Sequence, residues 1–297
     1  MYQDLKGIIT PVVTVFDNDE NIVEDGYRTV IDYLINHGVH GIFSCGGQGE
    51  AHSLTQDEKL RLLDICLETV NGRVPVLMGT AGLTTRSAIE MTRAAKEAGA
   101  DYATILTPYY ISPNQDELYR HYCDIMDAVD IPVIIYNNPW RTHQNIQPET
   151  VARLCEYSIN MAGIKDSSGD LGLTFGYKRL CPDYFKVFVG RDQVIYAALC
   201  GGVDGAVAAT SNAAIDIVLS IYTEFIAGNH TAARNYQEKL VPFREFFSQG
   251  TFPVIVKEAM ALQGLPSGPC RKPVGPISDE KRAQLRAILT TMGLHTC

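Results

Sequence analysis

The segment 161–170, MAGIKDSSGD, places a lysine at the end of a short apolar run. Residues 161–164 are apolar, Lys165 follows, and Asp166 opens a polar stretch, an order typical of a buried β-strand that runs into a loop. Lysine is almost never fully buried without a partner. Either Lys165 reaches solvent or pairs with Asp166, or its apolar surroundings disfavour the protonated amine and leave a nucleophile for a ketone.

Three other segments carry groups that suit such an imine: GGQGE at 46–50, TPYY at 107–110 and YNNPWR at 136–141. A tyrosine phenol can move protons, and the backbone N–H groups of a glycine-rich turn can hold a carboxylate. Neither a pair of carboxylates nor a Ser/His pair accompanies them. The combination favours imine chemistry, with Lys165 as nucleophile.

Each of these groups also has an ordinary structural explanation. The glycines of GGQGE could serve only to turn the chain sharply. Tyr136 could be a core aromatic residue with its hydroxyl at the surface. Arg141 is either a surface arginine or a two-pronged ligand for a second carboxylate. Asp192, in the segment GRD at 190–192, either caps the following helix or contacts substrate.

The elements that must position these residues alternate along the chain. Strand-like runs are predicted over 7–16, 41–44, 75–79, 102–106, 132–136, 162–165, 185–190 and 205–208, each followed by an amphipathic helical run. Because no hairpin signal joins them, we expect a parallel sheet, and eight units in about 230 residues match a (β/α)₈ TIM barrel. A doubly wound sheet is the alternative, but no Gly-x-Gly-x-x-Gly follows the first strand.

The last part of the chain predicts helices only, over 232–247, 253–263 and 278–292. We therefore expect a barrel over residues 1–227 and a C-terminal helical extension over 228–297, packed on the barrel as one structural unit. Active sites of such barrels lie at the C-terminal ends of the strands. GGQGE, TPYY, YNNPWR, Lys165 and GRD all follow predicted strands and would meet there.

Composition excludes several classes of protein. The net charge of −9 argues against a general nucleic-acid binder, and no apolar run approaches the ~20 residues of a membrane span. The beginning of the chain, MYQDLKGIITP, has no secretory signal pattern. The 8 cysteines show no Cys-x-x-Cys spacing and the 7 histidines no His-Glu-x-x-His pattern. We expect reduced thiols, a cytoplasmic location and no metal site.

The four motifs GGQGE, TPYY, YNNPWR and GIKDSSGD (163–170) resemble those of the dihydrodipicolinate synthase / N-acetylneuraminate lyase family in order and spacing. The resemblance covers essentially the whole chain. It implies a class I aldolase on a (β/α)₈ barrel, which joins pyruvate, or a 2-oxo acid that yields it, to a lysine as a Schiff base. It also implies a homotetramer built from two tight dimers.

The resemblance assigns roles to individual residues. Lys165 corresponds to the Schiff-base lysine, and Tyr136 to the phenol that relays protons. Tyr110 corresponds to a tyrosine that reaches across the tight dimer into the neighbouring site.

Residues that would bind substrate follow from the same motifs. Gly47 and Gln48 stand where the family holds the pyruvate carboxylate, and Val207 matches an apolar residue beside bound pyruvate. Arg141 matches the arginine that binds the carboxylate of the aldehyde in the synthases. Asp192 and Asn138 complete the set that we expect at the far end of the substrate.

Two departures separate this chain from the named branches. The synthases usually have two threonines where Gly47 and Gln48 stand, and the first belongs to their proton relay. The neuraminate lyases usually have Ser-Thr there and Asp-Glu after the glycine of the seventh strand, whereas here Gln193 follows Asp192. The chain is more similar to relatives that act on 2-keto-3-deoxy sugar acids or other 2-oxo acids.

The predicted function is therefore a Schiff-base lyase that makes or breaks a C–C bond next to pyruvate, with an aldehyde as the second reactant. The imine is the electron sink, so no cofactor is expected. The alternatives are 4-hydroxy-tetrahydrodipicolinate synthase, a 2-oxo acid dehydratase using the same imine, and a barrel that binds a 2-oxo acid without catalysis.

Overall fold

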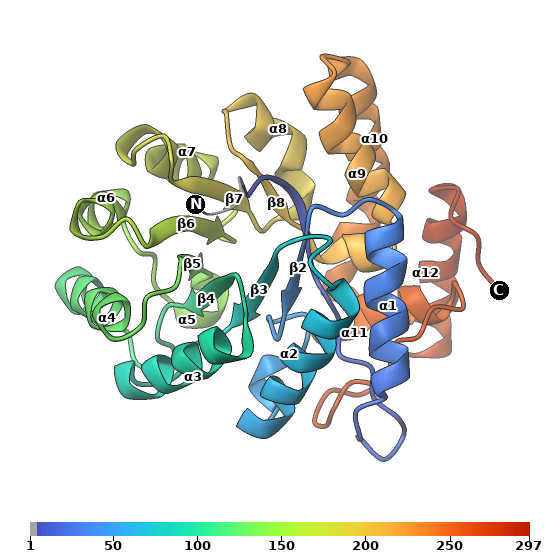
Figure 1. Cartoon of the computed structure of the whole chain (residues 1–297). Helices are drawn as coiled ribbons and strands as arrows, with labels where there is room; N and C mark the ends of the chain where they lie inside the picture. Colours follow the sequence, from blue (N-terminus) through green and yellow to red (C-terminus); the bar gives the residue numbers. More distant parts are fainter. Residues whose placement is uncertain (1–4) are drawn as a thin grey trace.

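Eight short parallel strands close into a barrel in the computed structural model, which describes residues 5–297. Neighbouring strands follow each other in chain order, and β8 pairs with β1. The predicted (β/α)₈ barrel is confirmed (Figure 1). The strands are β1 (Gly7–Pro11), β2 (Gly41–Ser44), β3 (Val76–Gly79), β4 (Tyr102–Leu106), β5 (Val133–Asn137), β6 (Met161–Asp166), β7 (Lys186–Val189) and β8 (Gly205–Val207).

Helices surround the strands on the outside of the barrel (Figure 1). They are α1 (Glu24–Asn36), α2 (Gln56–Val70), α3 (Thr85–Ala98), α4 (Gln115–Ala128), α5 (Pro139–Thr142), α6 (Pro148–Tyr157), α7 (Leu171–Leu180), α8 (Ile195–Cys200) and α9 (Ile215–Ile226). Beyond α9 lie α10 (His230–Glu245), α11 (Val254–Ala261) and α12 (Asp279–Thr291). Short 3₁₀ turns are η1 (Ala51–Ser53), η2 (Asp192–Val194), η3 (Ala209–Asn212) and η4 (Phe246–Gln249).

Local sequence signals fix where the helices begin and end. Thr55 and Glu58 form a reciprocal capping box at the start of α2, with Glu58 N donating to the Thr55 hydroxyl at 3.2 Å and Thr55 N donating to the Glu58 carboxylate at 2.8 Å. Asn71 ends the helix in the left-handed region at φ 45°. These groups satisfy backbone donors and acceptors that a helix leaves unpaired at its ends.

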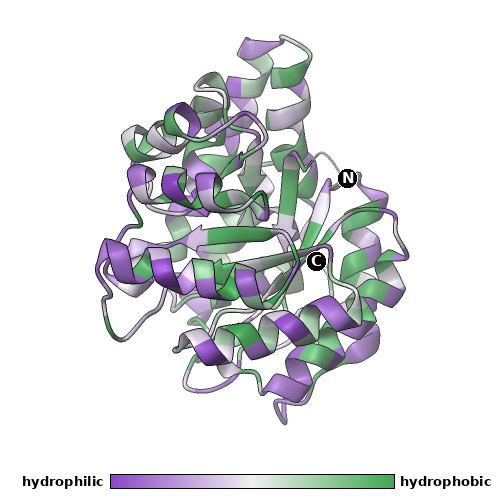
Figure 2. Ribbon diagram, turned by 60° about the vertical axis from the view of Figure 1, so that its left-hand side comes forward, coloured by the Kyte–Doolittle hydropathy of each residue, from purple (hydrophilic) through white to green (hydrophobic). Residues whose placement is uncertain are grey.

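The apolar side chains form two cores, because each strand carries one face into the barrel and one face toward the helices. Figure 2 shows apolar strands enclosed by helices whose outer faces are polar. The barrel interior contains Leu5, Ile9, Phe43, Leu77, Tyr102, Ile134, Phe188 and Val207. A larger core lies between the strands and the helices and continues into the C-terminal helices.

Two predicted elements differ from those observed by more than two residues at one end. The first strand was expected over 7–16 but ends at Pro11, because proline has no N–H for the sheet ladder. The helical run expected directly after the eighth strand begins only at Ile215, because the 3₁₀ turn η3 comes first. Asn212 holds that turn against the first strand, since its Nδ2 donates to Pro11 O at 3.0 Å and its Oδ1 accepts from Val13 N at 3.2 Å.

Residues 5–297 contain no membrane-spanning helix, no metal-binding cluster and no disulfide bond. No helix in this range is long and apolar enough to cross a membrane. No three His, Cys, Asp or Glu side chains in it gather closely enough to hold a metal ion. All eight cysteines are free thiols; six are buried, and Cys200 and Cys297 are exposed.

Candidate active site

Lys165 projects into the barrel from the end of β6, where it is only 5 % exposed. Its register partners are Tyr136 on β5 and Phe188 on β7. Lys165 Nζ lies 3.9 Å from the centroid of the Tyr136 ring and 5.2 Å from that of the Phe43 ring. The amine is therefore buried among aromatic side chains at the C-terminal end of the barrel.

Asp166 does not pair with Lys165, because successive residues of a strand point to opposite faces. Its carboxylate accepts hydrogen bonds from Asn137 Nδ2 at 2.9 Å, from Ser168 N and Oγ at 3.0 and 2.8 Å, and from Thr174 Oγ1 at 2.6 Å. The carboxylate fixes the loop after β6 instead of neutralising the amine. Of the two explanations that the sequence allows for Lys165, the ordinary salt bridge is excluded.

The phenol of Tyr136 is polarised by its neighbours. Burial raises the pKa of Tyr136, but the charge of Lys165 and hydrogen bonds with Ser167, Asn138 and Lys165 outweigh it, so the pKa lies below its usual value. Asn138 Nδ2 donates to Tyr136 Oη at 3.0 Å. A phenol with a lowered pKa, beside the amine, is suited to accept and return a proton.

The loop after β2 carries Gly47 and Gln48 to the same end of the barrel. A Cβ atom added at Gly47 would lie 3.9 Å from Tyr136 Oη and 3.7 Å from the Phe252 ring, so the position faces the phenol and has room for a side chain. Gln48 is 3 % exposed; its Nε2 lies 3.5 Å from Pro253 O, and its Oε1 has no hydrogen-bond partner. An orphaned buried amide oxygen is a group that a ligand can satisfy.

A buried ion pair attaches this loop to the C-terminal helices. Lys257 Nζ on α11 lies 2.7 Å from Glu50 Oε1, and both side chains are 1 % exposed. Lys257 also donates to Pro269 O at 2.7 Å, while Arg271 N donates to Glu50 Oε2 at 3.0 Å. Because buried charges must be paired and hydrogen-bonded, these contacts fix the far end of the GGQGE loop.

Arg141 and Asp192 lie at different depths. Arg141, on the exposed side of α5, places its guanidinium carbon 5.3 Å from the centroid of the Phe252 ring. Asp192 is 1 % exposed, and one of its oxygens accepts from Thr210 N at 2.8 Å and from Thr210 Oγ1 at 2.6 Å. The Asp192 carboxylate thus joins the loops that follow β7 and β8, and does not cap a helix.

Val207 and Tyr110 mark the inner and outer limits of the site. Val207 is 2 % exposed and packs in the barrel interior with Phe43 and Phe188. Tyr110 is 97 % exposed and has a left-handed backbone at φ 75°. A single chain therefore brings Lys165, Tyr136, Gly47, Asn138 and Val207 to one end of the barrel and leaves Tyr110 projecting outward.

Sequence reasoning missed several residues that line this end of the barrel. Ser167 interacts with Tyr136, and a Cβ at Gly190 would lie 2.0 Å from Ser167 Oγ and 3.1 Å from Lys165 Cε, so a side chain there would displace Ser167 and crowd Lys165. Phe252 lies against Gly47 from the C-terminal extension. The position of Gly190 in GRD, directly after a strand, was a usable signal; nothing in the sequence around Phe252 links it to the barrel.

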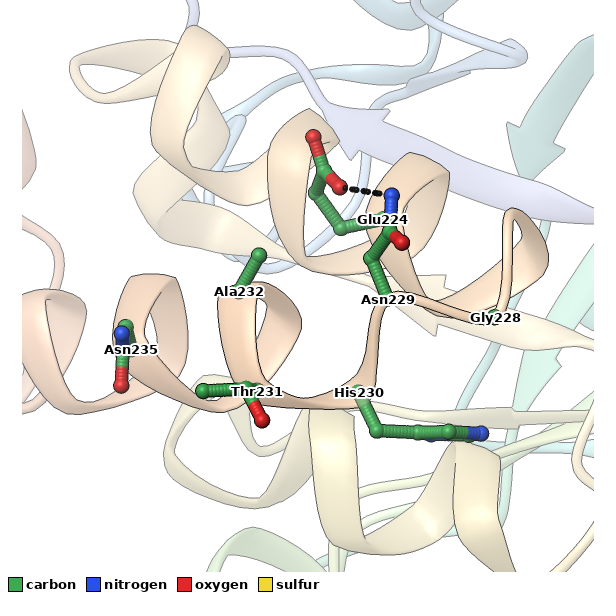
Figure 3. A pocket seen from close by; sticks show the side chains of 7 residues that line it. All are labelled: Glu224, Gly228, Asn229, His230, Thr231, Ala232 and Asn235. Atoms are coloured by element: carbon green, nitrogen blue, oxygen red, sulfur yellow. Dashed lines mark hydrogen bonds between the residues drawn. The ribbon is translucent and has the colours of Figure 1, made fainter.

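A hollow of about 580 Å³ lies elsewhere, at the turn between α9 and α10 (Figure 3). It is lined by Glu224, Gly228, Asn229, His230, Thr231, Ala232 and Asn235. Asn229 Nδ2 donates to Glu224 Oε2 at 2.9 Å across the turn. None of these residues ends a strand, so the hollow is separate from the cluster around Lys165.

The family model described as the dihydrodipicolinate synthetase family matches residues 4–292. The chain belongs to this family. A 4-hydroxy-tetrahydrodipicolinate synthase from Pelobacter propionicus is 38% identical over 289 residues, which cover 97% of this chain and 99% of that protein. The protein of the same name from Syntrophus aciditrophicus is 39% identical over 289 residues, with the same coverage.

Solved structures of the dihydrodipicolinate synthetase family agree with this fold. The dihydrodipicolinate synthase from Thermotoga maritima has a TM-score of 0.95 at 31% identity, covering 99% of this chain and 100% of that one. A prophage protein of the family from E. coli K12, solved in complex with pyruvate, has a TM-score of 0.94 at 31% identity, covering 98% and 99%. The resemblance in the motifs is confirmed, and the protein is a lyase of the aldolase type.

Proposed function

We propose that the enzyme forms a Schiff base between Lys165 and pyruvate and cleaves or forms the adjacent C–C bond, with a 2-keto-3-deoxy sugar acid as substrate. The observation that carries the mechanism is the buried Lys165 amine, 3.9 Å from the ring of Tyr136 and without a carboxylate partner from Asp166. An amine in such surroundings, next to a phenol of lowered pKa, has the groups that imine chemistry needs.

The proposed cleavage proceeds in balanced steps. The unprotonated Lys165 Nζ attacks C2 of the keto acid, and the C2 hydroxyl then leaves as water with a proton from the Tyr136 phenol, which gives the protonated imine and a phenolate. The C3–C4 bond then breaks: its electrons enter the imine to give an enamine, while Tyr136 takes the C4 hydroxyl proton and an aldehyde leaves. Protonation at C3 and addition of water release pyruvate and regenerate the lysine. Condensation is the same sequence in reverse.

The remaining site residues hold the two ends of the substrate in this proposal. Backbone N–H groups at Gly47 and Gln48 bind the carboxylate next to the ketone, and Val207 packs beside the methyl group of pyruvate. Arg141, Asp192 and Asn138 bind the far end of the substrate. Asn138 also donates a hydrogen bond to Tyr136 Oη at 3.0 Å. Because the imine supplies the electron sink, the mechanism uses no metal or organic cofactor.

Gly47 supports a keto-deoxy sugar acid over the synthase reaction. A side chain at position 47 would start 3.9 Å from Tyr136 Oη, within reach of a hydrogen bond from a hydroxyl one bond further out. The synthases, by the resemblance, place a relay threonine there, and glycine offers no hydroxyl. The relay beyond Tyr136 must therefore pass through water or substrate in this enzyme.

Synthase activity is the second candidate, because Arg141 is present and because relatives 38 to 39% identical carry the name 4-hydroxy-tetrahydrodipicolinate synthase. Assays with aspartate semialdehyde and pyruvate, and separately with 2-keto-3-deoxygluconate, distinguish the two. Release of pyruvate from the sugar acid supports our proposal. A new keto acid formed without pyruvate release would instead identify a dehydratase.

The mechanism itself is tested by intact mass after borohydride reduction in the presence of pyruvate. We expect a single adduct that peptide mapping places on Lys165, its absence in Lys165→Ala, and its persistence in the control Lys96→Ala, which removes an exposed lysine on α3. Absence of an adduct on folded wild-type protein with any 2-oxo acid would reject the mechanism and leave a differently acting or non-catalytic barrel.

We also propose that two copies form a tight dimer in which Tyr110 enters the neighbouring site, and that two dimers form a tetramer. The 97 % exposure of Tyr110 and the 59 % exposure of Ile111 beside it support this assignment. Mixing Lys165→Ala with Tyr110→Phe subunits tests it, because each mixed dimer then has one site with Lys165 from one subunit and Tyr110 from the other. Recovered activity supports exchange across the dimer, and a monomer by sedimentation would reject it.

A further inference from the structure

Three arginines stand around the candidate active site with an unusual choice of partners. The guanidinium carbon of Arg141 lies 5.3 Å from the Phe252 ring centroid, that of Arg191 lies 5.0 Å from Trp140, and that of Arg244 lies 4.6 Å from Phe247. None of the three forms an ion pair with a carboxylate of residues 5–297. A stacked guanidinium keeps its N–H edge free to bind an anion.

Packing brings the three arginines to the same end of the barrel. The Phe252 ring beneath Arg141 lies 3.7 Å from a Cβ placed at Gly47. Phe252 also lines a small hollow with Phe247, the ring beneath Arg244. Two of the arginines therefore rest on neighbouring rings beside the GGQGE loop.

Arg191 reaches the site from the other side. It follows Gly190, the residue against Lys165, and its Nε donates to Ser167 O at 3.1 Å. Its stacking partner Trp140 belongs to α5, the helix that carries Arg141. Arg191 thus connects the lysine strand to the helix of Arg141.

The three charges act on one another. Burial lowers the pKa of Arg191, and the charges of Arg244 and Arg141 lower it further, while Tyr136 and Asp192 act in the opposite direction. Like charges held together destabilise a folded protein unless a ligand neutralises them. The chain has 34 acidic residues against 25 basic ones, so carboxylate partners were not scarce.

A stacked arginine elsewhere in the molecule shows the usual arrangement. The Arg153 guanidinium carbon lies 4.3 Å from the Tyr119 ring centroid, and its NH1 lies 3.1 Å from a carboxylate oxygen of Asp116. Stacking and ion pairing occur together there. The absence of carboxylates from the other three arginines is therefore specific to the site.

Resting on the proposed function, we propose that the end of the second reactant remote from its aldehyde carries two negative charges, and that Arg191 and Arg244 bind this end together with Arg141. One arginine can bind a single carboxylate with two parallel hydrogen bonds, so three arginines provide more charge and more donors than one carboxylate uses. They suit an oxyanion with two negative charges. A phosphate monoester and a pair of carboxylates share this chemistry. The positioning of the anion would hold the aldehyde opposite the enamine on Lys165.

Direct binding can be measured without knowing the substrate, because Trp140 is the only tryptophan of the chain and stacks on Arg191. Titration of the full-length protein with inorganic phosphate, and separately with malonate, at constant ionic strength should change Trp140 fluorescence saturably. Acetate, with a single charge, should bind at least about tenfold more weakly, since it lacks the second charge-assisted contact. Equal responses to all three anions would overturn the proposal.

Variants assign the binding to the named residues. Arg191→Gln and Arg244→Gln should each weaken phosphate binding by about tenfold or more, while the control Arg153→Gln should leave it unchanged. Circular dichroism checks that each variant is folded, and Arg191→Lys, which keeps the charge, should recover part of the affinity. Unchanged affinity in either folded glutamine variant would overturn its assignment.

Kinetics separate this proposal from the proposed mechanism. With pyruvate, wild-type enzyme should use glyceraldehyde 3-phosphate or a dicarboxylate aldehyde with a kcat/KM at least about tenfold above that for glyceraldehyde, and the two glutamine variants should lose this preference. The pair of charged aldehydes identifies which oxyanion is preferred. The borohydride adduct with pyruvate alone should persist in both variants. Absence of that adduct in the wild type would instead refute the proposed imine mechanism.

Discussion

Lys165 and Tyr136 are register partners on adjacent strands, so the barrel itself sets the geometry between amine and phenol. The backbone hydrogen bonds of the two strands leave little freedom at this point, and the ring of Phe43 closes the other side of the amine at 5.2 Å. A pair held by sheet hydrogen bonds is pre-organised before substrate arrives. In the proposed mechanism this gains rate, because the enzyme need not order the groups during the reaction.

Tyr136→Phe should separate proton transfer from imine formation. The variant loses only the hydroxyl, so we expect turnover to fall by about 100- to 10,000-fold, the usual contribution of a positioned acid or base, while a pyruvate adduct still forms on Lys165. Steady-state rates and borohydride trapping measure the two effects. An unchanged rate would remove the proton-transfer role from Tyr136.

The sequence alone was enough to find the residues that follow strands, because a lysine or tyrosine at the end of an apolar run is a local pattern. Lys165, Tyr136 and the GGQGE turn were found in this way, and they do meet. Phe252 and Arg244 were not found, since they lie on the C-terminal extension and reach the site only through packing. Ser167 was missed because its contact with Tyr136 depends on how the loop after β6 is held by Asp166.

At the scale of elements, the loop after β2 depends on helices that come last in the chain. Glu50 has a left-handed backbone at φ 56°, which is uncommon for a residue with a side chain. Its carboxylate is held by Lys257 and by the backbone N–H of Arg271, and Arg271 in turn forms an ion pair with Glu58 on α2. The chain thus uses a buried charge network to fix the turn that would hold pyruvate.

Lys257→Met should therefore affect pyruvate binding although Lys257 is remote from the proposed chemistry. Loss of the partner leaves the Glu50 carboxylate buried and unpaired, and we expect stability to fall by about 3–5 kcal/mol. In the folded fraction, KM for pyruvate should rise more than kcat falls. Chemical denaturation and steady-state kinetics measure both effects.

Two further variants test that interpretation. Lys257→Met combined with Glu50→Gln removes the unpaired charge and should recover part of the stability. Arg61→Met, which removes an exposed pair with Glu24, should change neither KM nor stability appreciably. An unchanged KM for pyruvate in folded Lys257→Met would show that the ion pair has no positioning role.

The contact between α3 and α4 predicts a pH dependence of stability. His121 on α4 pairs its Nδ1 with Thr85 Oγ1 at 2.9 Å, its Nε2 is buried without a partner, and burial lowers the pKa of the imidazole to about 4. Between about pH 6.5 and pH 4 the unfolded chain therefore binds a proton that the folded chain excludes. Stability should be highest above about pH 6.5 and fall by about 3 kcal/mol toward pH 4.

Replacing the imidazole isolates this contribution. His121→Gln should show a shallower loss of stability between pH 6.5 and pH 4 than the wild type, because glutamine does not titrate. Urea denaturation at several pH values in this range measures the slope. Identical slopes for the two proteins would exclude His121 as the source.

At the scale of the whole molecule, the barrel was predictable because eight apolar runs and eight amphipathic runs repeat a single unit. The way the C-terminal helices attach was not predictable, because it depends on contacts between residues more than 200 positions apart. Lys257 with Glu50 and Arg271 with Glu58 are two of these contacts. No local pattern encodes such pairs, so one sequence cannot reveal them.

We propose that residues 228–297 are part of one folding unit with the barrel, and truncation tests this. A chain ending at residue 227 loses side chains that are at most 2 % exposed in the shared core: Leu240, Phe243, Ile255, Met260 and Leu285. Burial of each contributes about 1.5–3 kcal/mol, so their sum is comparable with the ~5–15 kcal/mol stability of a typical protein.

The truncated chain should therefore fail to fold cooperatively. Near-ultraviolet circular dichroism should show no fixed tertiary packing, and thermal melts should lack a sharp transition. Cooperative unfolding of the 1–227 fragment would mean that the barrel is an independent domain and that the extension is an addition to it.

The link between Glu50 and Lys257 also has a consequence for how the enzyme is made. The two residues are 207 positions apart, so at about 5–20 residues per second a ribosome needs roughly 10–40 s to deliver the lysine after the glutamate. Throughout that interval the turn that we propose holds pyruvate lacks the lysine that pairs with Glu50. Helices and strands of the barrel can form locally during translation, but we expect the turn to be fixed for pyruvate binding only after the last quarter of the chain has left the ribosome.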